Sequence, residues 1–103
     1  MLTGKQRRHL RALGHKLEIV VHVGKGGLDD GIIAAVNQAL TDHELIKLKI
    51  GDAAGVDRHE AAEALATKTK SQVAQVLGYT VLLYRRHPQK PVIVLPKPAK
   101  LDA

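Results

Sequence analysis

The chain has 103 residues, no cysteine, and a net charge of +6. Its length predicts one domain, and the missing cysteines exclude disulfides, thiol catalysis and cysteine-based zinc sites. No apolar run approaches the length of a membrane span, so we expect a soluble, cytoplasmic protein without a membrane partner. A small basic domain attracts polyanions, nucleic acid above all.

The first predicted helix is rich in cations. Thr3 and Gln6 fit a capping box, which predicts a helix reaching about Leu13 and ending at Gly14. Four of the seven residues from 5 to 11 are Lys or Arg and none is acidic, and they are Lys5, Arg7, Arg8 and Arg11. Charged helix faces normally mix both signs. The face is therefore either a solvated surface or a polyanion contact.

A glycine-rich turn follows the first predicted strand. The apolar run 17–23 predicts that strand, and 28–40 predicts a helix with Ile32, Ile33, Val36 and Leu40 on its buried side. Between them stands Gly24-Lys25-Gly26-Gly27. Such a turn leaves backbone N–H groups open to a phosphate, and Lys25 adds a charge. Taken alone, it is more often a tight connection than a site.

Neighbouring residues narrow what this turn can be. A Walker A loop fails because Gly26 follows Lys25, and a Rossmann fingerprint fails because Asp29 stands at its third glycine. What remains is Gly-x-x-Gly, which clamps RNA backbone in KH domains, although there it joins two helices. Asp29 and Asp30 suit the start of a helix but oppose an anion there. Any phosphate is therefore expected on the turn itself.

The second half of the chain predicts one helix and several strands. We expect strands at 44–50, 72–77, 80–85 and 92–95, and a helix from 57 to 70. Gly78-Tyr79 predicts a hairpin turn, and Lys47 and Lys49 share one strand face. The result is an α/β fold of two layers, α-β-α-β-α-β-β, with the helices on one side of a mixed four-stranded sheet and its other face partly open. Residues 1–95 form the predicted domain and 96–103 a flexible, proline-containing tail.

The sequence shows no constellation typical of an enzyme. The six histidines lack metal-ligand spacing, and Ser71 is the only serine. The carboxylates form no acid–base pair. We therefore expect no catalysis, no metal, no cofactor and no small-molecule substrate. Base stacking has little support, because only Tyr84 is predicted on the open sheet face, so contact to RNA is expected mainly at phosphates.

Four segments resemble the bacterial YhbY proteins, which are stand-alone CRM (chloroplast RNA splicing and ribosome maturation) domains. They are LRALGH at 10–15, VHVGKGGL at 21–28, ELIKLKI at 44–50 and VLGYTVLLYR at 76–85. The resemblance runs in order to about Leu95. It implies a fold similar to the C-terminal domain of initiation factor 3, RNA binding through the Gly-x-x-Gly turn, and association with the precursor of the large ribosomal subunit during assembly.

The leading hypothesis is therefore an RNA-binding ribosome-assembly factor that contacts precursor large-subunit ribosomal RNA. Its predicted contacts are Gly24, Lys25, Gly26, Gly27, Arg7, Arg8, Arg11, Lys47, Lys49, Arg85 and Arg86. Two alternatives remain open: a basic DNA-compacting protein, and a protein-interaction module that docks on an acidic partner. An enzyme with a phosphate-bearing substrate is disfavoured by the missing acid–base pair.

Overall fold

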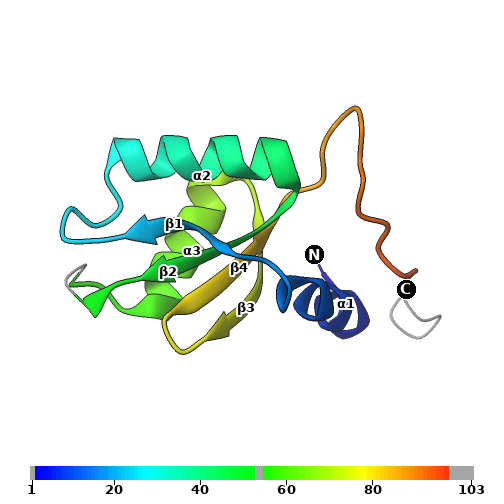
Figure 1. The fold of residues 1–103 in the computed structure, drawn as a ribbon, viewed down its shortest axis with the longest axis horizontal. Coiled ribbons are helices and arrows are strands. Elements are labelled where there is room, and N and C mark those ends of the chain that lie inside the picture. The colour runs from blue at the N-terminus through cyan, green and yellow to red at the C-terminus, as the bar shows by residue number, and fades with distance from the viewer. Residues whose placement is uncertain (1, 53–54, 98–103) are drawn as a thin grey trace.

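The computed structural model describes residues 2–52 and 55–97 (Figure 1). Seven elements follow one another, namely α1 (Gly4–Gly14), β1 (Ile19–Val23), α2 (Asp30–His43), β2 (Leu45–Ile50), α3 (Arg58–Thr69), β3 (Gln72–Leu77) and β4 (Thr80–Tyr84). This confirms the predicted α/β class and the order of elements. The capping box at Thr3 and Gln6 is also confirmed, because each side chain bonds the other residue's backbone N–H, at 3.1 and 3.0 Å.

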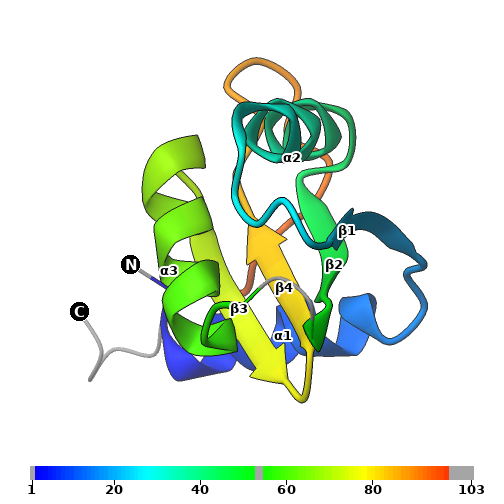
Figure 2. The ribbon, with the colours of Figure 1, turned by 90° about the vertical axis from the view of Figure 1, so that its left-hand side faces the viewer.

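The sheet is mixed and four-stranded, as predicted, with strand order β1-β2-β4-β3. β1 and β2 run parallel, and the other pairs are antiparallel. Val23 therefore ends β1 beside Ile50, while Thr80 begins β4 beside Lys49. We call this end of the sheet, onto which Figure 2 looks, the turn end. It brings the glycine-rich turn and the β3–β4 hairpin to the same side of the molecule.

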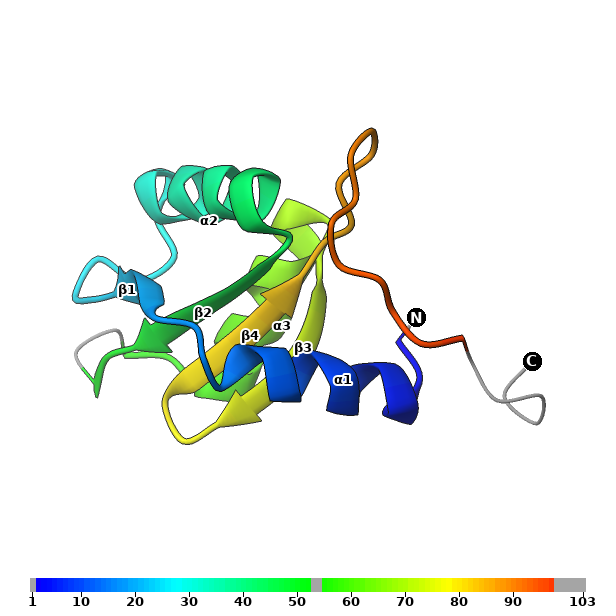
Figure 3. The same cartoon turned by 45° about the vertical axis from the view of Figure 1, so that its right-hand side comes forward.

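Helices cover both faces of the sheet. Val81 and Leu83 of β4 belong to a large aliphatic core under α2 and α3, whereas Leu82 and Tyr84 belong to a second core under α1. Figure 3 shows α1 in front of β3 and β4, with α3 behind them. This placement corrects the expectation that the helices share one face. Leu2 and Leu10 are enough to hold α1 on the sheet, because Leu10 is fully enclosed, although most other residues of the helix are exposed.

Gly14 ends α1, as predicted, but it does so without the left-handed conformation that favours glycine at a helix stop. Gly14 has no positive φ, and the capping residue His15 is right-handed, with φ −57°. A β-carbon at Gly14 would stand 2.5 Å from the nearest Leu82 methyl carbon. The missing side chain therefore lets the end of α1 lie directly on β4.

Glu44 ties the C-terminal segment to the sheet. It ends α2 with a φ of 63° and is almost fully buried. Its carboxylate accepts N–H bonds from His87, Val92 and Ile93, at 2.9, 2.6 and 2.8 Å. Burial raises the pKa of this carboxyl, but the three backbone donors and the charge of His87 outweigh it and lower the pKa overall.

The predicted strand at 92–95 is wrong, because residues 92–97 form no strand in the structure. Glu44 takes the N–H groups of Val92 and Ile93, so they are not free to join a sheet ladder. Ile93 and Leu95 instead pack against the second core, and the Gln6 amide donates to the Pro96 carbonyl at 3.2 Å. The segment therefore lies against α1 as far as Pro96. The rest of the predicted tail, 98–103, lies outside the described residues.

Candidate nucleic-acid interface

The turn Gly24–Gly27 is closed by its own backbone. The Gly27 N–H donates to the Gly24 carbonyl at 2.9 Å, and Gly27 has a φ of 67°, which favours glycine. A β-carbon on Gly26 would come within 2.9 Å of an Asp29 carboxylate oxygen. Gly24 differs, because a β-carbon there would meet nothing within 4 Å. The turn therefore has room for a side chain at position 24. The glycine there leaves the exposed backbone accessible to a ligand.

Asp29 occupies the start of α2. Its side chain accepts the Ile32 N–H at 2.9 Å and so caps the helix. A carboxylate already neutralises the positive end of this helix, which leaves no favourable place for a second anion there. An incoming phosphate is left with the exposed backbone of Gly24 and Gly26 and with the exposed Lys25 side chain.

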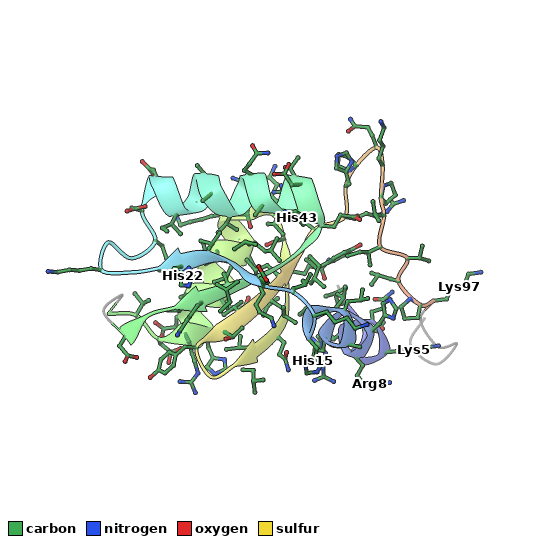
Figure 4. The ribbon with its side chains drawn as sticks, viewed as in Figure 1. Lys5, Arg8, His15, His22, His43 and Lys97 are labelled. Atoms are coloured by element: carbon green, nitrogen blue, oxygen red, sulfur yellow. The ribbon has the colours of Figure 1, made fainter. Side chains whose placement is uncertain are left out.

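The sheet adds cations to the same end of the molecule. Lys49 lies between His22 of β1 and Thr80 of β4 in the strand register, so these three side chains share one face. Lys49 and His22 are exposed there, in the part of this face that α1 leaves uncovered. Figure 4 shows His22 beside β1. Sequence reasoning missed His22, whose place beside Lys49 depends on the pairing of β1 with β2.

A narrow cleft joins the sheet to the end of α1. Arg11 of α1 and His15, which follows that helix, line it together with Lys47 of β2, and its volume is about 150 Å³. Three groups that carry or can take a positive charge thus come from two elements. Among the predicted α1 arginines, Arg11 is the one that joins a sheet lysine in this cleft.

The other two α1 arginines lie elsewhere. Arg7 lines a separate cleft with Glu63 of α3 and Gln72 of β3. Arg8 is exposed and, like Lys5, points away from the sheet (Figure 4). These residues extend the positive surface around α1 but are not part of the turn end.

Arg85 is half-buried, and hydrogen bonds to the fold hold its guanidinium. Its guanidinium donates to the Asn37 side chain, the Asn37 carbonyl, the Thr69 carbonyl and the Thr41 hydroxyl, at 2.8, 3.0, 2.7 and 3.0 Å. These bonds join β4 to α2 and α3. Arg85 and the exposed Arg86 follow β4, at the end of the sheet opposite the turn. We therefore exclude Arg85 from the candidate interface, and Arg86 is remote from its centre.

Nothing in residues 2–52 and 55–97 groups three or more His, Asp or Glu side chains as a metal site would require. Within the same ranges, no helix is long and apolar enough to cross a membrane.

The fold and this surface define a small α/β domain with a bare glycine turn and a basic face at one end of its sheet. The chain belongs to the CRS1 / YhbY (CRM) domain family, whose model matches residues 2–85. The predicted family is therefore confirmed.

Similar proteins from several bacteria carry RNA-binding names. The chain is 41% identical, over 93% of its length and all of the relative's, to the "Probable RNA-binding protein YqeI" of Bacillus subtilis. It is 37% identical, over 82% of its length and 85% of the relative's, to an "RNA-binding protein" of Haemophilus influenzae. A solution structure from Staphylococcus aureus, described as a candidate RNA-binding protein, matches with a TM-score of 0.76 and 36% identity. That match covers 93% of this chain and 100% of the other.

Proposed function

We propose that this protein binds RNA through the glycine turn and the basic face beside it. The contacts are the turn residues, the two sheet lysines and the cleft arginine, with the outer arginines of α1 at the margin. They are Gly24, Lys25, Gly26, Gly27, Lys47, Lys49 and Arg11, with Arg7 and Arg8 outside them. Contacts of this kind address phosphates, so shape rather than base sequence carries most of the specificity.

One observation carries the proposal. The turn presents bare backbone at Gly24, and Lys49 stands exposed at the same end of the sheet. Bare N–H groups and fixed cations on one surface are what a phosphate backbone requires. The RNA-binding names of the relatives support the same reading.

We further propose that the RNA is the precursor of large-subunit ribosomal RNA and that the protein acts in ribosome assembly, in the cytoplasm. The resemblance of four segments to the YhbY proteins supports this. Crosslinking in cells, followed by sequencing of the attached RNA, tests it. Large-subunit ribosomal RNA should be enriched over total RNA. Enrichment of messenger RNA alone would contradict the assembly role while leaving RNA binding intact.

A substitution in the turn tests the site. Gly24→Asp adds a negative charge where a side chain meets nothing within 4 Å and where φ is not left-handed, so the fold should tolerate it. We expect RNA affinity to fall at least tenfold, which corresponds to about 1.4 kcal/mol of binding free energy. Gly24→Asn, which adds similar bulk without charge, is the matched control for the charge. Full affinity in the Asp variant would remove the turn from the site.

Competition between ligands separates the two alternatives. Structured RNA should displace a labelled RNA at lower concentration than duplex DNA does. Equal displacement would favour the DNA-compacting reading. Failure of both nucleic acids to bind at physiological salt would favour docking on an acidic protein.

A further inference from the structure

We infer that Tyr79, at the tip of the β3–β4 hairpin, is a stacking site for an unpaired nucleobase next to the glycine turn. This inference deepens the proposed RNA binding and depends on it. It specifies the class of ligand, which is an unpaired stretch or bulge of RNA rather than a continuous duplex.

The two tyrosines have opposite surroundings. Tyr84 is 4% exposed and fills the core under α1, so its ring cannot meet a base. Tyr79 is 49% exposed. The prediction that Tyr84 alone could stack is therefore wrong, because α1 covers the face on which Tyr84 lies. The exposed aromatic ring belongs to the hairpin instead.

Arg58 holds one side of the Tyr79 ring. Its guanidinium carbon lies 5.5 Å from the ring centroid, in the range of a cation–π contact. Arg58 begins α3, so two separate elements meet at the hairpin tip. The contact restrains the tyrosine and leaves a positive charge beside it. An exposed aromatic ring next to a cation is the combination found in proteins that bind single-stranded nucleic acid.

Two backbone hydrogen bonds place Tyr79 near the turn. The Ile50 N–H donates to the Tyr79 carbonyl, and the Gly51 N–H donates to the Val23 carbonyl, both at 2.8 Å. Val23 and Tyr79 therefore flank the end of β2 on either side. Two strand spacings separate them, about 10 Å. That distance corresponds to roughly three nucleotide rises of about 3.4 Å along one strand.

The need for an unpaired base follows from the geometry of nucleic acids. In a duplex both faces of a base are covered by its neighbours, so a protein ring cannot stack on it. An RNA strand with its backbone on the turn could place an unstacked base on Tyr79. Such stacking contributes about 1–3 kcal/mol per base and tolerates any base identity.

Affinity measurements with two probes test the inference. The probes are a single-stranded oligoadenylate and the same oligomer annealed to oligouridylate. Tyr79→Ala should weaken binding of the single strand by about 5- to 150-fold and leave duplex binding within twofold. Tyr79→Phe should bind both probes like the parent protein. A urea midpoint for each variant checks that the fold is intact.

Fluorescence gives a readout that does not depend on affinity. The chain has no tryptophan, so Tyr79→Trp introduces a single one at the hairpin. Stacking on adenine should quench its emission when the oligoadenylate binds. Val92→Trp, at an 82% exposed position in the C-terminal segment, is the matched control and should show no quenching.

The outcomes separate this inference from the proposed function. If Tyr79→Ala binds oligoadenylate within twofold of the parent while Gly24→Asp still loses affinity, the stacking site is wrong and RNA binding stands. If Tyr79→Ala loses the same affinity for the single strand and for the duplex, the stacking site is also wrong, because the substitution then weakens RNA binding without regard to unpaired bases. If the parent protein binds structured RNA but neither probe at physiological salt, the stacking site is wrong and RNA binding stands, whereas failure to bind structured RNA as well overturns both proposals.

Discussion

The guanidinium of Arg85 holds Asn37 at two oxygens, the side-chain amide oxygen at 2.8 Å and the backbone carbonyl at 3.0 Å. This pair fastens the end of β4 to the middle of α2. The same guanidinium also reaches Thr69 at the end of α3. A residue that the sequence assigns to RNA therefore links three elements of the fold.

Replacing Arg85 should cost stability rather than a specific RNA contact. Arg85→Ala leaves the Asn37 and Thr69 oxygens without their donor. We expect the free energy of unfolding to fall by about 2–4 kcal/mol. Urea denaturation measures this. Arg86→Ala, one residue further on at an exposed position, is the control and should change stability by less than about 0.5 kcal/mol. Equal effects for the two variants would contradict the structural role.

Removing the charge of Glu44 should loosen the C-terminal segment. Glu44→Gln offers one accepting oxygen where the carboxylate has two, and it turns an NH₂ group toward backbone donors. We expect the free energy of unfolding to fall by about 1–3 kcal/mol at neutral pH, as measured by urea denaturation. Glu63→Gln, on the exposed side of α3, should stay within about 0.5 kcal/mol of the parent protein.

The pH dependence of that loss has a definite sign. The folded state lowers the pKa of Glu44, so its stabilisation is complete above the unfolded pKa of about 4.3. It disappears as the pH falls through the lower, folded-state pKa. The stability difference between the parent and Glu44→Gln should therefore narrow as the pH falls below about 4.5. A difference that widens below that pH would show that the carboxylate is not stabilised in the fold.

Adding one methyl group at Gly14 should strain the second core. In Gly14→Ala the new β-carbon would stand 2.5 Å from a Leu82 methyl carbon, and we expect a loss of about 1–3 kcal/mol. Combining it with Leu82→Val should recover part of the loss, which a double-mutant cycle measures. Gly4→Ala is the control, because a β-carbon there stands 3.7 Å from its nearest neighbour. If the stability changes of the two single variants simply add in the double variant, the close packing of Gly14 on Leu82 would be contradicted.

The elements of this fold depend on local signals, and the sequence shows them well. Thr3 with Gln6, Asp29 and Asp57 each cap a helix, and Gly78 turns the hairpin with a φ of 58°. These contacts lie within a few residues along the chain. The pattern of Ile46, Leu48 and Ile50 likewise predicts the buried side of β2.

The candidate site could be predicted only in part, because it depends on contacts between distant residues. Arg85 and Arg86 are equivalent in sequence, yet Asn37, 48 residues away, engages only the first. The sequence predicts Glu44 only as a strand residue, whereas the structure shows N–H groups of the C-terminal segment bonded to its carboxylate. The sequence predicts Tyr79 only as a turn residue, whereas the structure places Arg58 over its ring. No local pattern specifies these pairings.

Salt dependence tests the basic face most directly. If Lys25, Lys47, Lys49 and Arg11 each engage one phosphate, log affinity for RNA should fall with log salt at a slope of about −3 to −4, and marginal contacts from Arg7 and Arg8 would make it steeper. Lys25→Glu with Lys49→Glu should make that slope shallower by about 2. Lys68→Glu with Lys90→Glu changes the net charge equally at exposed positions away from the turn end, and should leave the slope unchanged. A flat slope for the parent protein, or the same change in both double variants, would contradict an RNA interface centred on the glycine turn.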